Sequence, residues 1–254
     1  MLRKESENII WLEFELLASF KNLTHGVLLR HGGHSTGAFD SLNVSFSKHT
    51  PSENQNVKAN RDKIQKVFKF KKLNDCNLDH ADKIVEITHE NNESRPKCDA
   101  ISTQLNEMAL MVTHADCQAA IFYDPVNHAI ANVHAGWRGN VKDIYGKTVQ
   151  FMKTRYGSSP NNLHVCISPS LGPHDAEFIN YRTELPEEFW EFQIKPFYFD
   201  LWSISKKQLM HAGVLEHHIQ ISGISTLSNP QDYFSYRREK TSGRHGTFVA
   251  LTKN

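Results

Sequence analysis

The sequence lacks an excess of charge of either sign. Of its 254 residues, 29 are Lys or Arg and 28 are Asp or Glu, which gives a formal net charge of +1 at pH 7. A protein that coats nucleic acid or lies on an acidic membrane needs a basic surplus. The composition therefore argues against both of these partners, whereas a small anion needs only a local cluster of arginines.

Cysteines and long apolar runs are also scarce. The four cysteines form no CxxC pair, and a secreted disulfide scaffold would be shorter and denser in cysteine. Glu13 and Glu15 interrupt the apolar run near the start of the chain, so this segment is not typical of a signal peptide. No stretch approaches the roughly 20 apolar residues of a membrane helix. We therefore expect a cytoplasmic protein with no membrane partner.

The common nucleotide-binding and hydrolase motifs are missing as well. The chain has no GxGxxG, P-loop, HExxH or GxSxG motif, and it lacks the H-x-E…P-C-x-x-C signature of nucleobase deaminases. It also contains no repeat, low-complexity block or linker rich in Pro, Gly or Ser. We therefore predict a single domain over residues 1–254.

Apolar periodicity predicts a mixed α/β fold. Helices are expected from Ser52 as an N-cap, and over residues 202–212. A third helix is expected from Asn140, with Asp143 as the acid in its first turn. Strands are predicted over 9–17, 26–30, 108–113, 119–123, 129–133, 163–167, 197–201, 217–221 and 247–251. Because strands alternate with helices and hairpin-like neighbours also occur, we predict one mixed sheet flanked by helices.

Two segments carry residues suited to chemistry. Thr113-His114-Ala115-Asp116-Cys117 follows an apolar strand, and His134-Ala135-Gly136-Trp137-Arg138-Gly139 precedes the helix expected at Asn140. Side chains at strand ends converge on a crevice in α/β sheets. The second segment also offers the free N–H groups of a helix N-terminus, close approach at Gly136 and the charge of Arg138. We therefore expect this loop to be placed for phosphate.

A metal site can be assembled from the same region. Cys117 and His134 are a soft and a borderline ligand, a combination that suits zinc or copper. Sixteen residues separate them, so the fold would have to bring them together. His80 is the best third ligand, because Asp79 and Asp82 stand ready to orient its second nitrogen. Three protein ligands and one open position are typical of a catalytic metal.

Other interpretations of these residues remain open. A cysteine after an apolar run is more often a small buried hydrophobic residue than a ligand. Asp116 and Cys117 with His134 could instead form a cysteine nucleophile and its base, without metal. Gly136 and Gly139 could form only a tight turn. Near the C-terminus, the aromatic and cationic residues of 233–244 either stack on a base and bind phosphate or form a solvated turn.

Several short motifs point to a known family when they are taken together. They are Arg30-x-Gly32-Gly33-x-Ser35, Ser41-Leu42-Asn43, Asn60-Arg61, Ala115-Asp116-Cys117, His134-Ala135-Gly136-Trp137-Arg138-Gly139, and Tyr236-Arg237-Arg238 through Gly243-Arg244. In this order they strongly resemble the YfiH family, also called the laccase-domain or multicopper polyphenol oxidase family. The likeness covers nearly the whole chain, and the block that starts at His134 is highly specific.

The resemblance implies a fold, a metal and an activity. The implied fold is α/β and similar to certain cysteine hydrolases, and the implied metal is zinc, held by His80, Cys117 and His134. The implied activity is phosphorolysis of adenosine, inosine, guanosine or methylthioadenosine, with adenosine deamination as a further reaction. The laccase label implies copper-dependent phenol oxidation, but the sequence lacks the paired His-x-His motifs of true multicopper oxidases.

Residue roles follow from the same comparison. Cys117, Asp116 and Arg61 are the expected catalytic residues. The expected substrate- and phosphate-binding residues are Arg30, Ser35, Asn43, Gly136, Arg138 and Arg238. The chain departs from the family pattern at Leu78-Asp79, Gln118-Ala119, His174-Asp175-Ala176 and Ser225, so substrate preference can have drifted.

The leading prediction is a zinc-dependent purine nucleoside phosphorylase acting on a purine nucleoside and phosphate. The alternatives are a metal-free cysteine hydrolase that uses Cys117 and His134, a copper-dependent polyphenol oxidase, and a non-catalytic protein that binds metal or nucleoside. The oligomeric state does not follow from the sequence.

Overall fold

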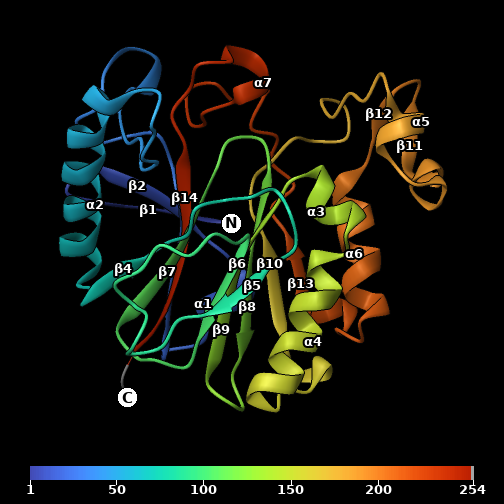
Figure 1. Ribbon diagram of the computed structural model, residues 1–254, viewed down its shortest axis with the longest axis horizontal. Helices are drawn as coiled ribbons and strands as arrows, with labels where there is room; N and C mark the ends of the chain where they lie inside the picture. Colours follow the sequence, from blue (N-terminus) through green and yellow to red (C-terminus); the bar gives the residue numbers. More distant parts are fainter. Residues whose placement is uncertain (253–254) are drawn as a thin grey trace.

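Two six-stranded sheets lie face to face in the computed structural model, which describes residues 1–252 (Figure 1). The first sheet has the order β1 (Leu2–Ser6), β2 (Ile9–Glu13), β3 (Leu23–Leu28), β14 (His245–Leu251), β7 (Met108–His114) and β4 (Lys72–Asn74). The second has the order β13 (Ile219–Ile221), β10 (His164–Ile167), β8 (Gln118–Asp124), β9 (Ala129–Ala135), β6 (Ala100–Thr103) and β5 (Ile84–Glu86). Both sheets mix parallel and antiparallel pairs.

Helices cover the outer face of each sheet (Figure 1). The helix α2 (Asn54–Phe68) covers the first sheet, and α3 (Trp137–Val141), α4 (Ile144–Tyr156) and α6 (Leu201–His211) cover the second. The short α1 (Glu15–Ala18) and α7 (Tyr236–Glu239) connect strands. A small lobe contains α5 (Tyr181–Glu184) with the hairpin β11 (Gln193–Lys195) and β12 (Tyr198–Phe199). Short 3-10 helices occur at Gly37–Phe39, Pro51–Glu53, Pro160–Asn162, Glu187–Phe192 and Glu216–His218.

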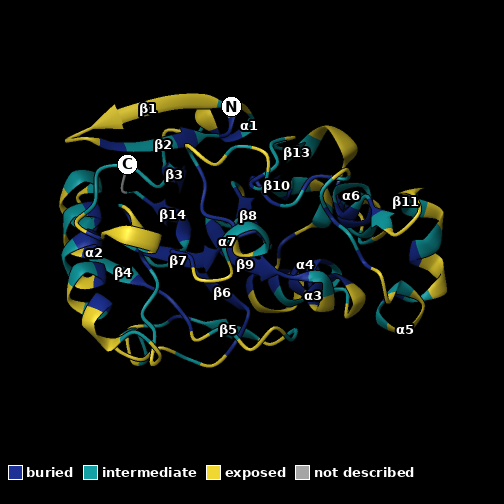
Figure 2. Cartoon of the chain, turned by 90° about the horizontal axis from the view of Figure 1, so that it is seen from above, coloured by how far each residue is buried: buried dark blue, intermediate teal, exposed yellow. Residues whose placement is uncertain are grey.

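The central strands are buried on both faces, which explains their continuous apolar sequences. In β7, Leu110 and Val112 pack into the core between the two sheets. The alternate residues Ala109 and Met111 pack with Ile64 of α2. Neighbouring side chains of a strand point to opposite faces. Figure 2 shows the resulting band of buried residues through the middle of the molecule.

The predicted α/β class is confirmed, but the single mixed sheet is wrong. The strands divide between two sheets, because a strand that is apolar on both faces can lie between a helix layer and a second sheet. The strand predicted over 9–17 ends at Glu13. Phe14 and Leu17 are then both fully buried, and their spacing of three residues fits the helical turn of α1.

Helix starts also differ from the prediction. Asn140 is not an N-cap: it lies within α3, and its side chain donates to Ser205 Oγ over 2.9 Å. The next helix, α4, is capped by Asp143, which accepts from Gly146 N over 3.1 Å. Ser52 lies in a 3-10 turn, and α2 begins at Asn54.

The end of the predicted strand over 197–201 is helical as well. The strand β12 stops at Phe199, and Asp200 caps α6 by accepting from Ser203 N over 3.0 Å. A side-chain acceptor at this position satisfies a free N–H group of the first helical turn. Among residues 1–252, no helix is long and apolar enough to span a membrane.

Candidate metal centre and substrate cavity

The fold brings the three predicted metal ligands together. One ligand atom each of His80, Cys117 and His134 lies within 4.8 Å of the other two. His134 pairs with Ala119 in the register of β8 and β9, and Cys117 comes two residues before Ala119. Alternation along the strand places Cys117 and His134 on the same face. The hairpin therefore positions two of the three side chains.

The third side chain, His80, is positioned by the buried carboxylate of Asp99, a residue that was not predicted from the sequence. Asp99 Oδ1 lies 3.0 Å from His134 Nδ1 and accepts from the backbone N–H of His80 over 2.9 Å. Its Oδ2 accepts from the backbone N–H of Ala81 over 2.8 Å. With Nδ1 engaged, the ring of His134 presents Nε2 to Cys117. Asp99 thus holds the His134 ring and the loop of His80, and it is fully buried.

The two acids expected to orient His80 lie elsewhere. Asp79 pairs with Lys97 over 2.7 Å, and Asp82 pairs with Lys147. Both are surface ion pairs. Nothing in the local sequence distinguishes Asp99 from these acids, because its contact with His134 spans 35 residues.

The electrostatics of the cluster favour a thiolate at Cys117 beside a protonated His134, whose proton a bound metal ion would displace. Burial disfavours ionisation of Cys117, but His134 and His80 outweigh it and lower the pKa of the thiol. Burial also disfavours the protonated form of His134, but Cys117 and Asp99 outweigh it and raise the pKa of the imidazole. A thiolate with two imidazoles is a donor set that zinc accepts, and copper also binds such ligands.

The backbone at Gly136 packs directly against this cluster. A Cβ atom at Gly136 would lie 3.2 Å from Cys117 Sγ and 3.7 Å from His80 Cδ2. The absence of a side chain therefore leaves room for an ion and its open coordination position. The residues present fit a metal ion of the zinc type.

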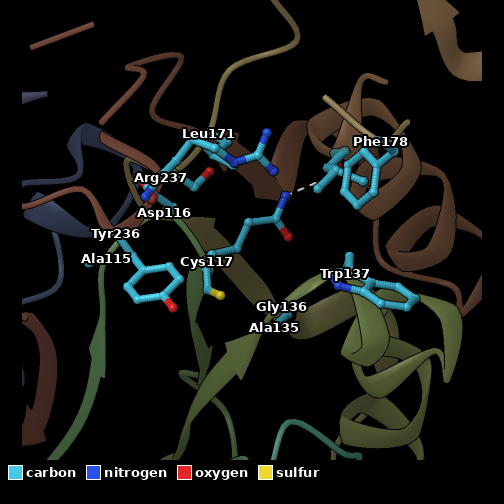
Figure 3. Close-up of a pocket in the computed structure, with 13 residues that line it drawn as sticks. Ala115, Asp116, Cys117, Ala135, Gly136, Trp137, Leu171, Phe178, Tyr236 and Arg237 are labelled. Atoms are coloured by element: carbon cyan, nitrogen blue, oxygen red, sulfur yellow. Dashed lines mark hydrogen bonds between the residues drawn. The ribbon is translucent and has the colours of Figure 1, made fainter. Parts of the chain in front are cut away.

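The cavity beside the cluster has two lobes, which meet at Cys117. The apolar lobe has a volume of about 180 Å³ and is lined mainly by Ala135, Trp137, Leu171, Phe178 and Leu201. The polar lobe has a volume of about 600 Å³ and is lined by Ser45, Asn77, His80, Arg95, His114, Arg244 and neighbouring residues. Ala115, Cys117 and Tyr236 line both lobes. In Figure 3 the rings of Tyr236 and Trp137 lie on opposite sides of the Cys117 side chain.

Three predicted site residues, Cys117, Asp116 and Gly136, line the apolar lobe. The carboxylate of Asp116 accepts from Thr226 Oγ1 over 2.8 Å and from Arg237 N over 2.6 Å. It therefore connects the segment before β8 to the loop of Thr226 and to α7.

The arginines predicted to contact phosphate are held by other groups. Arg30 donates to the carbonyl oxygens of Asp40 and Pro230. Arg238 donates to three carbonyl oxygens, those of Thr226, Leu227 and Tyr233. Neither arginine is among the residues that line the two lobes.

The remaining predicted residues line neither lobe of the cavity. Arg61 is buried and donates to Asp75 Oδ2 over 2.7 Å. Arg138 is exposed, with its guanidinium 4.3 Å from the centroid of the Trp137 ring. The buried Ser35 accepts from Asn60 Nδ2 over 3.0 Å.

Asn43 supports the polar lobe from behind. Its Oδ1 accepts from the backbone N–H of Arg244 over 2.9 Å. Arg244 itself belongs to the C-terminal cluster noted in the sequence, whereas Arg95 carried no sequence signal because it lies in an ordinary polar loop.

The fold and the His80–Cys117–His134 cluster define an α/β protein with a candidate catalytic metal centre. The model of the multi-copper polyphenol oxidoreductase laccase family matches residues 24–252. The chain therefore belongs to this family, and the family inferred from the motifs is confirmed.

Relatives and solved structures agree with this assignment. The chain is 29% identical over 250 residues to the purine nucleoside phosphorylase YlmD of Geobacillus stearothermophilus, covering 91% of this chain and 90% of that protein. It is 26% identical over 236 residues to the purine nucleoside phosphorylase YfiH of Escherichia coli, covering 87% of this chain and 91% of that protein. The crystal structure of YlmD from Geobacillus stearothermophilus matches with a TM-score of 0.87 and 26% identity, covering 98% of each chain. The YfiH structure from Bacillus licheniformis matches with a TM-score of 0.87 and 25% identity, covering 98% of this chain and 99% of that one. The likeness to cysteine hydrolases stays a prediction.

Proposed function

We propose that this protein is a zinc-dependent purine nucleoside phosphorylase. It would convert adenosine, inosine, guanosine or methylthioadenosine and phosphate into the free base and a ribose 1-phosphate. The observation that carries the proposal is the position of the His80–Cys117–His134 cluster in the wall of the polar lobe, with Cys117 shared by both lobes, in a chain whose relatives are named purine nucleoside phosphorylases. The single-domain organisation and the cytoplasmic location stay predictions.

The two lobes suit the two parts of the reaction. A purine ring fits the apolar lobe, where Trp137 and Phe178 form an edge-to-face pair with ring centroids 6.3 Å apart. Tyr236 covers Cys117 from the other side, with half of its surface exposed, so it can pack against an entering ligand. The glycosidic bond would then lie near Cys117, between the base and the polar lobe.

The protein groups at this junction have distinct tasks. Zinc held by the three ligands would supply Lewis-acid charge and, for adenosine deamination, would lower the pKa of a bound water. Asp99 fixes the orientation of His134, and Gly136 leaves space beside the thiolate. Asp116 ties the loop of Thr226 and the start of α7 to the segment that carries Cys117. The contacts of Arg30, Arg61, Arg238, Ser35 and Asn43 favour a role in holding the walls of the cavity.

The test combines turnover with metal analysis on the same preparation. Purified protein is incubated with each of the four nucleosides with and without phosphate, and base, ribose 1-phosphate and inosine are quantified. We expect phosphate-dependent release of base and close to one zinc per chain, and we expect a Cys117→Ala variant to lose both. Zinc-loaded protein that releases no base from any of these nucleosides would overturn the proposal.

A second candidate is a metal-free cysteine hydrolase. Cys117, His134 and Asp99 form a thiol–imidazole–carboxylate series in which the pKa of the thiol is lowered. The same elemental analysis separates the two candidates, because a tightly bound zinc that depends on Cys117 is incompatible with a free thiolate nucleophile. The family name adds copper-dependent phenol oxidation as a control reaction in the same experiment.

A further inference from the structure

A partly buried cation at the cavity has no carboxylate partner. Arg244 lines the polar lobe, and its Nη1 donates to the carbonyl oxygens of Ser242 and Gly243 over 2.7 and 3.0 Å. Its guanidinium lies 5.4 Å from the centroid of the Tyr236 ring. Across the part of the chain that the structure describes, no carboxylate forms an ion pair with it. Burial accordingly lowers the pKa of this arginine. A charge withdrawn from water needs a counter-charge, and a bound anion would supply it.

A second arginine adds positive charge to the same lobe. Arg95 and Arg61 both bind the buried Asp75, each with an Nη2 to Oδ2 distance of 2.7 Å. Two guanidinium groups on one carboxylate leave a net positive charge. Arg61 is buried, whereas the Arg95 side chain is 37% exposed and lines the polar lobe. The ring of Phe46 packs against both guanidinium groups, with its centroid 4.5 Å from Arg61 Cζ and 5.2 Å from Arg95 Cζ. Arg61 thus neutralises Asp75 and leaves the charge of Arg95 available at the cavity.

We propose that the polar lobe is the phosphate-binding subsite, with Arg244 and Arg95 binding the anion. This inference rests on the proposed phosphorylase function and deepens it. Phosphate would approach the sugar from the polar lobe, on the side of Cys117 opposite the apolar lobe. Arg61 is a positioning residue in this arrangement, because it acts through Asp75 on Arg95.

The first experiment measures the Michaelis constants for phosphate and nucleoside separately. We expect Arg244→Gln and Arg95→Gln each to raise KM for phosphate about tenfold or more, because each removes a charge-assisted contact. KM for the nucleoside should change less than about threefold. Arg244→Lys keeps the charge but loses the planar guanidinium, so its KM for phosphate should lie between the values of wild type and Arg244→Gln. Arg182→Gln is the control, since this arginine lies over Tyr181 at a separate surface groove.

The second experiment needs no turnover. Inorganic phosphate should raise the melting temperature of the wild-type protein relative to chloride at equal ionic strength. This increase should be lost in Arg95→Gln, in which Asp75 keeps its contact with Arg61 and the fold is retained.

The outcomes separate this inference from the proposed function. An active enzyme whose KM for phosphate is unchanged in both glutamine variants overturns the subsite and leaves the function standing. Phosphate stabilisation that depends on Arg95 and Arg244, in a protein that cleaves no nucleoside, supports the anion site and overturns the function. A wild-type melting temperature that does not respond to phosphate, together with an unchanged KM, excludes the subsite.

Discussion

Replacing Gly136 by alanine tests the metal centre at the scale of one methyl group. The backbone at Gly136 has φ −73° and ψ 173°, which any residue can adopt, so alanine introduces no backbone strain. Its Cβ would lie 3.2 Å from Cys117 Sγ and 3.9 Å from His134 Cε1. The first distance is shorter than the roughly 3.5–4.0 Å of a favourable contact between non-bonded carbon atoms, and sulfur is larger than carbon. The thiolate must therefore move by a few tenths of an ångström, away from the position that the three ligands share.

Such crowding has a predictable cost. Adding a methyl group to a packed site costs about 1–3 kcal/mol, which corresponds to a loss of about 5- to 150-fold in metal affinity if the strain falls on the bound form. The metal-free protein can relax by rotating Cys117, so its melting temperature should fall only slightly. Zinc affinity is measured by competition with a chromogenic chelator, and melting is followed with and without zinc.

Gly139→Ala is the matched control on the same short helix. Its Cβ would meet Ile144 Cγ2 at 3.5 Å and the Ala81 carbonyl oxygen at 3.6 Å, which are ordinary contacts. Alanine within a helix should add about 0.5–1 kcal/mol of stability without changing metal affinity. Equal zinc affinities for Gly136→Ala and Gly139→Ala would show that the cluster is not a metal centre of the geometry described.

Three further predictions follow from the same contacts. Asp99→Asn removes the charge that orients His134 and should weaken zinc binding about 10- to 100-fold in the chelator assay. The control Asp82→Asn should leave zinc affinity unchanged, and equal zinc affinities of the two variants would refute the orienting role of Asp99. Tyr236→Ala should raise KM for the nucleoside about tenfold, with a smaller rise in KM for phosphate because Arg244 loses the ring it packs on. Tyr236→Phe should behave as wild type; a loss in the phenylalanine variant would point to the hydroxyl rather than the ring. Burial and two neighbouring arginines lower the pKa of His245 to about 3 in the folded protein, whereas the pKa in the unfolded chain is 6.5. Below pH 6.5 the unfolded chain therefore binds one proton more than the folded protein, and the free energy of unfolding falls as the pH falls. Between pH 7.5 and 5.5 wild type should lose about 1.4 kcal/mol more unfolding free energy than His245→Gln in urea titrations; parallel losses would contradict the assignment.

Local patterns predicted the elements of the fold better than their arrangement. The apolar runs of β7, β8 and β9 were recognised as strands, because they are short and bounded by polar residues. Their division between two sheets was not, since a run that is buried on both faces carries no mark of which layer covers each face. The predicted cap at Asn140 failed for a similar reason. Its side chain instead donates a hydrogen bond to Ser205 of α6, which lies 65 residues further along the chain.

The residues of the candidate site could likewise be placed from the sequence only where their proximity is local. Cys117 and His134 lie on one hairpin, so their proximity is a local consequence of strand pairing. His80 enters from a different loop, and only the family resemblance connected it to the other two. Asp99, Arg95 and His114 owe their positions to contacts between distant segments, which no spacing rule in a single sequence encodes.

The choice between a metal ligand and a free nucleophile at Cys117 depends on what Asp99 does. A cysteine nucleophile with its base needs an acid only to orient the imidazole, and one carboxylate oxygen on His134 suffices. Here Oδ1 of Asp99 contacts His134 and also accepts from the backbone N–H of His80, and Oδ2 accepts from the backbone N–H of Ala81. His80 adopts a left-handed conformation with φ 54°, which is costly for a residue with a side chain. A loop held in this way by the carboxylate that orients His134 serves to deliver a third ligand, and this favours the metal centre over the nucleophile.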